Sequence, residues 1–231
     1  MTYDDLRAAL SDKATLSIET EGKLHLYAGL LKSWNEKMNL TSIVEEPEVI
    51  EKHFYDCLIP AKIRSFDHMS IADIGTGAGF PGLVWAIVFP TCHVSLVEAT
   101  GKKCTFLAEV IKELALSNVE VLNKRAEDLS FREHYDLVVA RALASLPILL
   151  EITAPFAKIG GEVLAMKSAK GREEITISRP AMQKLHLSLK DTQEDFLPNG
   201  DGLRLNFFFL KNEKTDHKYP RKWAEIEKKP L

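Results

Sequence analysis

The chain has 231 residues, of which 45% are hydrophobic and 27% are charged, and its formal net charge is −3. This composition suits one globular domain with an appendage, or two small domains, and excludes collagen-like, mucin-like and wholly disordered chains. Three cysteines without a Cys-x-x-Cys pair predict neither a disulfide framework nor a zinc site, so no metal is expected and a reduced, cytoplasmic setting is favoured.

Residues 1–64 are predicted to be helical. Leu24, Tyr27, Leu31 and Trp34 follow one another at the spacing of an amphipathic helix. Turn-forming residues, Asn-Leu-Thr-Ser at positions 39–42, then interrupt the pattern. A further helix is expected to begin near position 47 and to end or kink at the proline of position 60. This part of the chain is expected to form a helical N-terminal cap.

From residue 70 the pattern changes to short runs rich in β-branched residues that alternate with helical stretches. The predicted strands are residues 70–74, 93–97, 119–122, 135–140, 161–166 and 205–210. This alternation indicates an α/β fold, a doubly wound and mostly parallel sheet with helices on both faces. The expected organisation is a helical cap at 1–64, a cofactor-binding domain at 65–212 and a basic C-terminal tail at 213–231.

A glycine-rich segment follows the first predicted strand. Gly75, Gly77 and Gly79 allow the backbone to turn tightly and to approach a ligand closely, at a junction where α/β folds bind nucleotide-like cofactors. Gly77, Gly79 and Gly82 also match the G-x-G-x-x-G dinucleotide fingerprint. The structural alternative is that these glycines only make the turn.

Two carboxylates flank this segment. Glu98 ends the second predicted strand, 21 residues beyond Gly77, where it can accept hydrogen bonds from both hydroxyls of a ribose. Nicotinamide enzymes and S-adenosylmethionine enzymes both use such a residue. Asp73 and the glycines after it resemble the first motif of class I methyltransferases, in which the carboxylate orients the loop or meets the methionine ammonium. A loop cap is the structural alternative for Asp73.

Further segments in the chain carry a more specific resemblance. They are Trp-Asn at 34–35, Asn-Leu-Thr-Ser at 39–42, Lys-His-Phe-Tyr-Asp-Cys at 52–57, Gly-Lys-Lys at 101–103, Phe-Leu at 106–107, Arg-Ala-Glu at 125–127 and Ala-Arg-Ala-Leu-Ala-Ser-Leu at 140–146. In this order, over nearly the whole chain, they resemble the bacterial 16S ribosomal RNA guanine-N7 methyltransferases, the glucose-inhibited division protein B family. The basic tail also looks like that of the family, but Trp-Ala-Glu at 223–225 departs from the Gly-Thr-Pro continuation common in relatives.

The resemblance implies S-adenosylmethionine as the cofactor and N7 of a specific guanine in 16S ribosomal RNA as the methyl acceptor. It implies that Gly75, Gly77 and Phe80 hold the methionine part of the cofactor. It also implies that Ala126 and Glu127 flank the adenine. A solvated loop acid is the structural alternative for Glu127.

Arg141, at the end of the fourth predicted strand, is the candidate positioning residue. It would bind the cofactor carboxylate or donate to guanine O6. The structural alternative is an ion pair with an acid such as Asp136 or Glu127. Guanine N7 carries a lone pair and no proton, so its methylation needs no general base. His53 and Asp56, three residues apart on one helix, are further candidates for acid-base or metal chemistry, with helix packing as the alternative.

Cys104 is expected to pack inside a helix and not to act as a nucleophile. The segment that follows the fourth strand also lacks the Asn- or Asp-Pro-Pro-aromatic pattern of enzymes that methylate exocyclic amines.

Charge is distributed unevenly along the chain. Residues 1–64 hold 8 basic and 11 acidic side chains, whereas residues 211–231 hold 7 and 4. Because local positive clusters attract RNA phosphates, we list as candidate RNA contacts Lys102, Lys103, Lys167, Lys170, Arg221 and Lys222. A solvated tail and loop are the alternative for these cations.

The expected partner is 16S ribosomal RNA or a small-subunit assembly intermediate, with no DNA or membrane partner. The longest apolar run, residues 82–89, is far shorter than the roughly 20 residues of a membrane span, and the amino terminus is not typical of a secretory signal. A monomer is the default expectation. Two other functions stay open, a nicotinamide-dependent oxidoreductase and a non-enzymatic ribosome assembly factor with a relic cofactor pocket.

Overall fold

A computed structural model, which describes residues 1–10, 14–200 and 202–231, confirms the doubly wound α/β fold. One seven-stranded sheet has the order β3-β2-β1-β4-β5-β7-β6. Strands β1 to β5 pair in parallel, and β7 is antiparallel to both β5 and β6. The strands are β1 (Ser70–Ile74), β2 (His93–Val97), β3 (Val119–Leu122), β4 (Tyr135–Arg141), β5 (Ala157–Ser168), β6 (Leu187–Phe196) and β7 (Leu203–Lys211).

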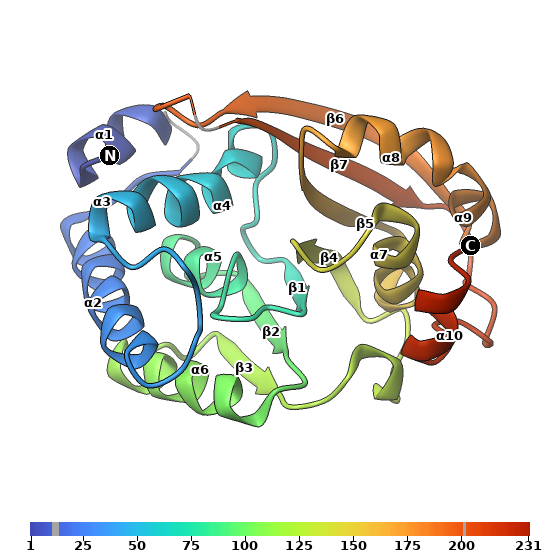
Figure 1. Ribbon diagram of the computed structural model, residues 1–231, viewed down its shortest axis with the longest axis horizontal. Helices are drawn as coiled ribbons and strands as arrows, with labels where there is room; N and C mark the ends of the chain where they lie inside the picture. Colours follow the sequence, from blue (N-terminus) through green and yellow to red (C-terminus); the bar gives the residue numbers. More distant parts are fainter. Residues whose placement is uncertain (11–13, 201) are drawn as a thin grey trace.

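Helices cover both faces of this sheet, with α2, α5 and α6 on one side and α7 to α9 on the other (Figure 1). The helices are α1 (Tyr3–Leu10), α2 (Ile18–Asn35), α3 (Glu46–Val49), α4 (Asp56–Leu58), α5 (Gly82–Val88), α6 (Gly101–Glu113), α7 (Leu146–Thr153), α8 (Gly171–Ile177), α9 (Arg179–Lys184) and α10 (Trp223–Lys228). A π-helical turn (Ile50–Tyr55) joins α3 to α4, and a 3₁₀ turn (Ile59–Lys62) follows α4. None of the described helices combines the length and the apolar character that crossing a bilayer requires.

Successive residues of the central strands enter opposite cores. Ile71 of β1 and Val139 of β4 belong to the core under α5 and α6, whereas Ala72 and Val138 belong to the core under α7. Both faces of the parallel strands are therefore buried, which explains why these strands appear in the sequence as nearly continuous apolar runs.

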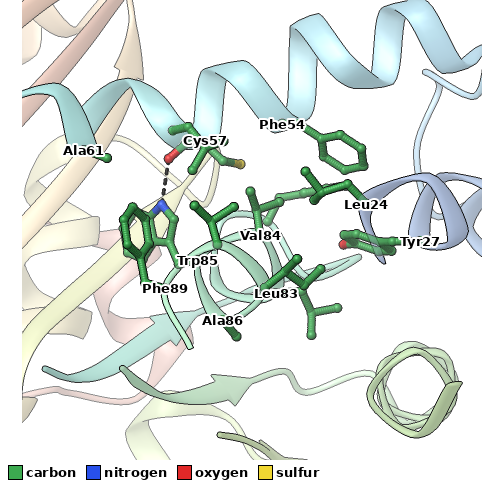
Figure 2. Close-up of a cluster of buried hydrophobic side chains, with 14 of the residues drawn as sticks. Leu24, Tyr27, Phe54, Cys57, Ala61, Leu83, Val84, Trp85, Ala86 and Phe89 are labelled. Atoms are coloured by element: carbon green, nitrogen blue, oxygen red, sulfur yellow. Dashed lines mark hydrogen bonds between the residues drawn. The ribbon is translucent and has the colours of Figure 1, made fainter. Parts of the chain in front are cut away.

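The N-terminal helices share a core with the sheet. Tyr27 of α2 and Phe54 of the π-helical turn are fully buried against α5 (Figure 2). The indole Nε1 of Trp85 donates to the backbone oxygen of Cys57 at 2.7 Å. This packing ties residues 46–62 to the helix that follows the glycine loop. The division into a cap, a cofactor-binding domain and a tail stays a prediction.

One strand differs from expectation. Strand β6 was not predicted, because its residues are mostly polar or charged and it forms the edge of the sheet, where charged side chains are common. Pro60 does not stop its helix at once. It lies at the start of the 3₁₀ turn, where tighter hydrogen bonding continues the helical run to Lys62.

Candidate functional site

The glycine loop leaves the carboxyl end of β1 and is fixed against β2. Gly75, Gly77 and Gly79 have φ angles of 70°, 62° and 98°, which favour glycine. The backbone N–H of Gly75 donates to the oxygen of Val97 at 2.9 Å. A Cβ atom at Gly75 would lie 2.5 Å from Cδ1 of Leu143, so the loop approaches the segment after β4 closely.

Asp73 is fully buried beneath this loop. Its Oδ2 atom accepts hydrogen bonds from Thr76 Oγ1 at 2.6 Å and from the backbone N–H of Gly82 at 2.8 Å. Its Oδ1 atom has no hydrogen-bond partner in the described part of the chain. Burial raises the pKa of Asp73 to about 6, against the lowering effect of those two hydrogen bonds. Asp73 therefore caps the loop and joins it to the start of α5.

Glu98 lies at the carboxyl end of β2 and faces the same loop. Its Oε2 accepts from the backbone N–H of Gly77 at 3.1 Å, and its Oε1 accepts from that of Thr100 at 2.8 Å. The carboxylate is 7% exposed. Each of its oxygens keeps a second lone pair, so Glu98 can still accept hydrogen bonds from a ligand.

A first cavity, of about 330 Å³, opens beside Glu98. It is lined by Ile74, Gly75, Val97, Glu98, Ala99, Lys103, Arg125, Ala126, Glu127, Ala142, Leu143, Ile152 and Trp223. Its volume and its mixed lining, with two carboxylates and two cations beside apolar residues, fit a nucleoside-sized cofactor. Four residues predicted from the sequence to contact the cofactor therefore lie together here: Gly75, Glu98, Ala126 and Glu127.

Phe80 lies in a different environment from the one expected. Its ring stacks on that of His53 with centroids 4.3 Å apart and packs near Tyr27 at 5.4 Å. Phe80 is 8% exposed and does not line the first cavity. The ring therefore joins the glycine loop to the N-terminal helices, and its expected contact with the methionine part of the cofactor stays a prediction.

Arg141 lines a second cavity of about 280 Å³, beyond the carboxyl ends of β4 and β5. The second cavity is lined by Asp56, Arg141, Ala142, Met166, Lys167, Ser168, Lys170, Glu174, Arg204 and Asn206. Ala142 belongs to the lining of both cavities. Its φ angle of 52° is unusual for a residue other than glycine. The two cavities therefore meet at a strained turn directly after β4.

The acid that pairs with Arg141 is Asp56, at 3.1 Å between Nη2 and Oδ2. The alternative partners considered from the sequence, Asp136 and Glu127, were wrong. Asp136 pairs with Lys158 at the amino-terminal edge of the sheet, and Glu127 lines the first cavity. Both lie near Arg141 in sequence, whereas Asp56 is brought to it by the packing of the N-terminal helices.

The guanidinium of Arg141 is held from several sides. It donates to the backbone oxygen of Lys52 at 2.9 Å and to Sγ of Cys57 at 3.2 Å. Arg204 of β7 binds the other oxygen of Asp56 at 3.0 Å, so this carboxylate lies between two guanidinium groups. Sequence reasoning missed Arg204, since nothing in the local pattern of β7 distinguishes it.

His53 links Arg141 to the Asn-Leu-Thr-Ser segment. Its Nδ1 lies 3.1 Å from Arg141 Nη2 and its Nε2 lies 3.0 Å from Thr41 Oγ1. A guanidinium only donates, so Nδ1 accepts and Nε2 carries the proton. Burial, and then the charge of Arg141, lower the pKa of His53 to about 3. His53 is therefore neutral and holds Arg141 by a hydrogen bond. No group of His, Cys, Asp or Glu among the described residues is arranged to hold a metal ion.

The Asn-Leu-Thr-Ser segment is itself fixed by a side chain of the preceding helix. Oδ1 of Asn35 accepts hydrogen bonds from the backbone N–H groups of Leu40 and Thr41, at 2.8 and 3.0 Å. A continuous set of hydrogen bonds therefore runs from the end of α2 through Thr41 and His53 to Arg141. Asn35 and Thr41 both lie in sequence segments that resemble the methyltransferase family, which is how the sequence pointed to them.

The six candidate RNA contacts divide into two groups. Lys167 pairs with Glu174 at 2.8 Å, Lys222 with Asp128 at 2.8 Å, and Arg221 with the fully buried Glu151. The other three have no ion pair within residues 1–10, 14–200 and 202–231: Lys102, Lys103 and Lys170. Lys103 lines the first cavity and Lys170 the second, whereas Lys102 is exposed at the start of α6.

The three cysteines are free and buried. Cys104 lies inside α6, where its thiol donates to the backbone oxygen of Glu98 at 3.3 Å. Burial raises the pKa of this thiol, which suits packing and not nucleophilic attack.

Comparisons with known proteins agree with this architecture. A family model described as GidB, rRNA small subunit methyltransferase G, matches residues 20–196. The Ribosomal RNA small subunit methyltransferase G of Mycoplasma capricolum is 42% identical, covering 93% of this chain and 93% of its own. The protein of the same name from Staphylococcus aureus strain Newman is 39% identical, covering 100% and 99%. The solved structure of M. jannaschii TYW2 in complex with AdoMet has a TM-score of 0.57 at 19% identity over 74% of this chain and 79% of its own, which supports the fold alone.

Proposed function

Because the chain belongs to the GidB family, rRNA small subunit methyltransferase G, we propose that it transfers a methyl group from S-adenosylmethionine to N7 of a specific guanine in 16S ribosomal RNA. One observation supports this most directly. The first cavity, with the features of a cofactor site, and the second cavity, with the features of a polar base site, share Ala142 in their linings. A base in the second cavity would therefore face a cofactor in the first.

In the first cavity the roles follow from the donors and acceptors present. S-adenosylmethionine supplies an electrophilic methyl group when it is bound. Glu98 is proposed to accept hydrogen bonds from the ribose hydroxyls, since it lines the cavity and each of its oxygens keeps a lone pair beside its contact with the backbone. Ala126 and Glu127 would contact the adenine, and Gly75 and Gly77 the methionine part. Asp73 would act through the loop that it caps.

In the second cavity Arg141 and Asp56 would recognise guanine. Guanine presents O6 as an acceptor and its N1–H and N2–H groups as donors. Arg141 has donors for O6, and each oxygen of Asp56 keeps a lone pair beside its contact with an arginine. We propose Arg141 as a positioning residue on the base side of the site, because it lines the second cavity and not the first.

The chemistry requires no proton to be moved. The bond from N7 to the methyl carbon forms as the bond from sulfur to carbon breaks, and the electron pair stays on sulfur. His53 has both ring nitrogens engaged and a pKa far below neutrality, so it serves to orient Arg141 and not as a base. Catalysis then rests on placing N7 in line with the methyl group.

The RNA partner would be 16S ribosomal RNA or an assembly intermediate of the small subunit. The enzyme would act as a monomer in the cytoplasm, with no DNA or membrane partner. Lys102, Lys103 and Lys170 are the proposed phosphate contacts, since they form no ion pair within the described residues and two of them line the cavities. Lys167, Arg221 and Lys222 would contribute less because each already has a carboxylate partner.

The test is methylation of small-subunit RNA taken from cells that lack this protein. With purified chain and S-adenosylmethionine, we expect one 7-methylguanosine to appear in 16S RNA, detected by cleavage at the alkylated base. No new 7-methylguanosine on either naked 16S RNA or small subunits would refute the substrate assignment, even if the cofactor binds.

Family membership favours this function over the two alternatives. A nicotinamide-dependent oxidoreductase would require calorimetry to show binding of the nicotinamide dinucleotide and none of S-adenosylmethionine. A non-enzymatic assembly factor would require a Gly75→Leu variant to keep its biological function after losing the cofactor. We expect neither result. In Gly75→Leu the leucine would meet Leu143 at a backbone that favours glycine, so cofactor binding should be lost and the biological function with it.

A further inference from the structure

The C-terminal segment, residues 213–231, packs beside the first cavity. Helix α10 lies next to α7 (Figure 1). Ile226 of α10 is fully buried and Tyr219 is 6% exposed, and both belong to the core on the α7 side of the sheet. Leu231 packs against the same core. The segment is therefore a docked part of the fold.

A buried ion pair fixes the position of this segment. Glu151 of α7 is fully buried, and its two carboxylate oxygens accept from Nε and Nη2 of Arg221 at 2.7 and 2.5 Å. The backbone N–H of Arg221 donates to the same carboxylate at 3.1 Å. Two parallel hydrogen bonds of this kind set an orientation as well as a distance. The residues immediately after Arg221 are thereby held against a 3₁₀ turn (Ala126–Asp128), where Lys222 pairs with Asp128.

Trp223 is the residue that this anchor brings to the first cavity. It lines the cavity together with Glu127, and its backbone N–H lies 3.4 Å from Oε1 of Glu127. Trp223 is the only aromatic side chain among the described residues that line the first cavity. Glu127 is a proposed adenine contact, so its contact with Trp223 places Trp223 toward the end assigned to the adenine. Aromatic rings are favourable surfaces for stacking a purine.

We propose that Trp223 forms the aromatic wall of the adenine end of the cofactor cavity and contacts the adenine ring, so that the C-terminal segment is part of the cofactor site. This inference rests on the proposed function in one respect, that the first cavity holds S-adenosylmethionine. It assigns the pair of Arg221 and Glu151 the role of positioning Trp223.

The experiment measures cofactor affinity by calorimetry, without RNA. Trp223→Ala is expected to raise the Kd for S-adenosylmethionine about tenfold or more, and Trp223→Phe by less than about threefold, since a phenyl ring still stacks. Glu227→Ala, an exposed position on the same helix, is the matched control and should leave the Kd unchanged. Melting temperatures of all variants verify that each one is folded.

Two further readouts separate contact with adenine from a general loosening of the fold. 5′-Methylthioadenosine keeps the adenosine and lacks the amino-acid end, so its Kd should rise by the same factor in Trp223→Ala. The chain has two other tryptophans, Trp34 and Trp85, which do not line the cavity. A change in tryptophan fluorescence on cofactor binding should therefore occur in the wild type and be lost in Trp223→Phe.

Equal or tighter binding by Trp223→Ala would overturn the inference, as would an unchanged fluorescence response in Trp223→Phe. Either result, with normal binding by the wild type, would leave the proposed function standing. Failure of the wild-type chain to bind S-adenosylmethionine at all would overturn the inference and the proposed function together.

Discussion

The two cavities that meet at Ala142 are built in different ways. The first is built mainly from residues at the ends of neighbouring strands, such as Gly75 and Glu98, to which the C-terminal segment adds Trp223. The second depends on contacts between distant parts of the chain, 84 positions from Cys57 to Arg141 and 148 from Asp56 to Arg204. Cofactor binding and base positioning should therefore be separable by substitution, because few residues serve both cavities.

Arg141→Lys should give the largest effect. Lysine keeps the charge but not the planar fork that reaches Asp56, Lys52 and His53 together. Because a misplacement near 1 Å can cost a factor of about 100, we expect kcat to fall about 100-fold or more. Calorimetry should show a Kd for S-adenosylmethionine within about threefold of the wild type.

The matched control for that substitution is Arg64→Lys. Arg64 is likewise held by ion pairs, with Glu162 and Asp191, but at the amino-terminal edge of the sheet. Its kcat should stay at the wild-type level. A parallel loss of cofactor affinity in Arg141→Lys would show that the two cavities are not separable.

Glu98→Ala should have the opposite effect to Arg141→Lys: it should weaken cofactor binding and leave kcat nearly unchanged. Loss of a hydrogen-bonding carboxylate costs about 1.5–3 kcal/mol, so the Kd for S-adenosylmethionine should rise about 10- to 150-fold. At saturating cofactor, kcat should fall by less than about threefold, since the base side is untouched. Glu120→Ala, which removes an exposed carboxylate bonded to Ser95 on the same sheet, serves as the control. An unchanged Kd would exclude Glu98 from the cofactor site.

His53, beside the second cavity, and Asp73, beneath the glycine loop, should change the free energy of unfolding with pH in opposite directions. The pKa of His53 is about 3 in the folded chain and near 6.5 in the unfolded chain, so the unfolded chain binds more protons in between, and stability falls as pH falls. Between pH 6.5 and 5 this amounts to about 2 kcal/mol. Denaturant unfolding at both pH values should show that His53→Gln is spared this loss, whereas the exposed His217→Gln is not.

Asp73 has the opposite effect on the pH dependence of stability. Its pKa is raised to about 6 from an ordinary value of 3.8, so the folded chain binds the proton more tightly and stability falls as pH rises between those values. The measured quantity is therefore the difference between wild type and His53→Gln, which removes the contribution of Asp73. Identical pH dependence in the two chains would contradict a neutral, buried His53.

Lys170→Ala should give the smallest effect. Removing one phosphate contact should reduce the slope of the logarithm of RNA affinity against the logarithm of salt concentration by roughly 0.7 to 1, measured with small-subunit RNA. Cofactor affinity should not change. Lys158→Ala, an exposed lysine paired with Asp136 at the opposite edge of the sheet, should leave the slope as it was. Equal slopes for all three chains would remove Lys170 from the RNA-binding surface.

The hydrophobic pattern and the glycine spacing were sufficient to predict the elements that depend on neighbouring residues in the sequence. The parallel strands and the glycine loop were predicted because both faces of the strands are buried and the loop glycines have positive φ angles. The edge strand β6 was not, since its polar residues carry no such pattern. The resemblance directed attention to Arg141, yet its partner Asp56 could not be inferred, because tertiary packing alone brings them together. Arg204 and Trp223 were missed for the same reason.

The turn at Ala142 leaves a single methyl group at the place where the two linings join. A larger side chain there would act as a spacer between two ligands whose other contacts remain in place. Such a variant would hold RNA and cofactor together without reacting. It could therefore be used to capture the complex of enzyme, RNA and S-adenosylmethionine before the methyl group is transferred.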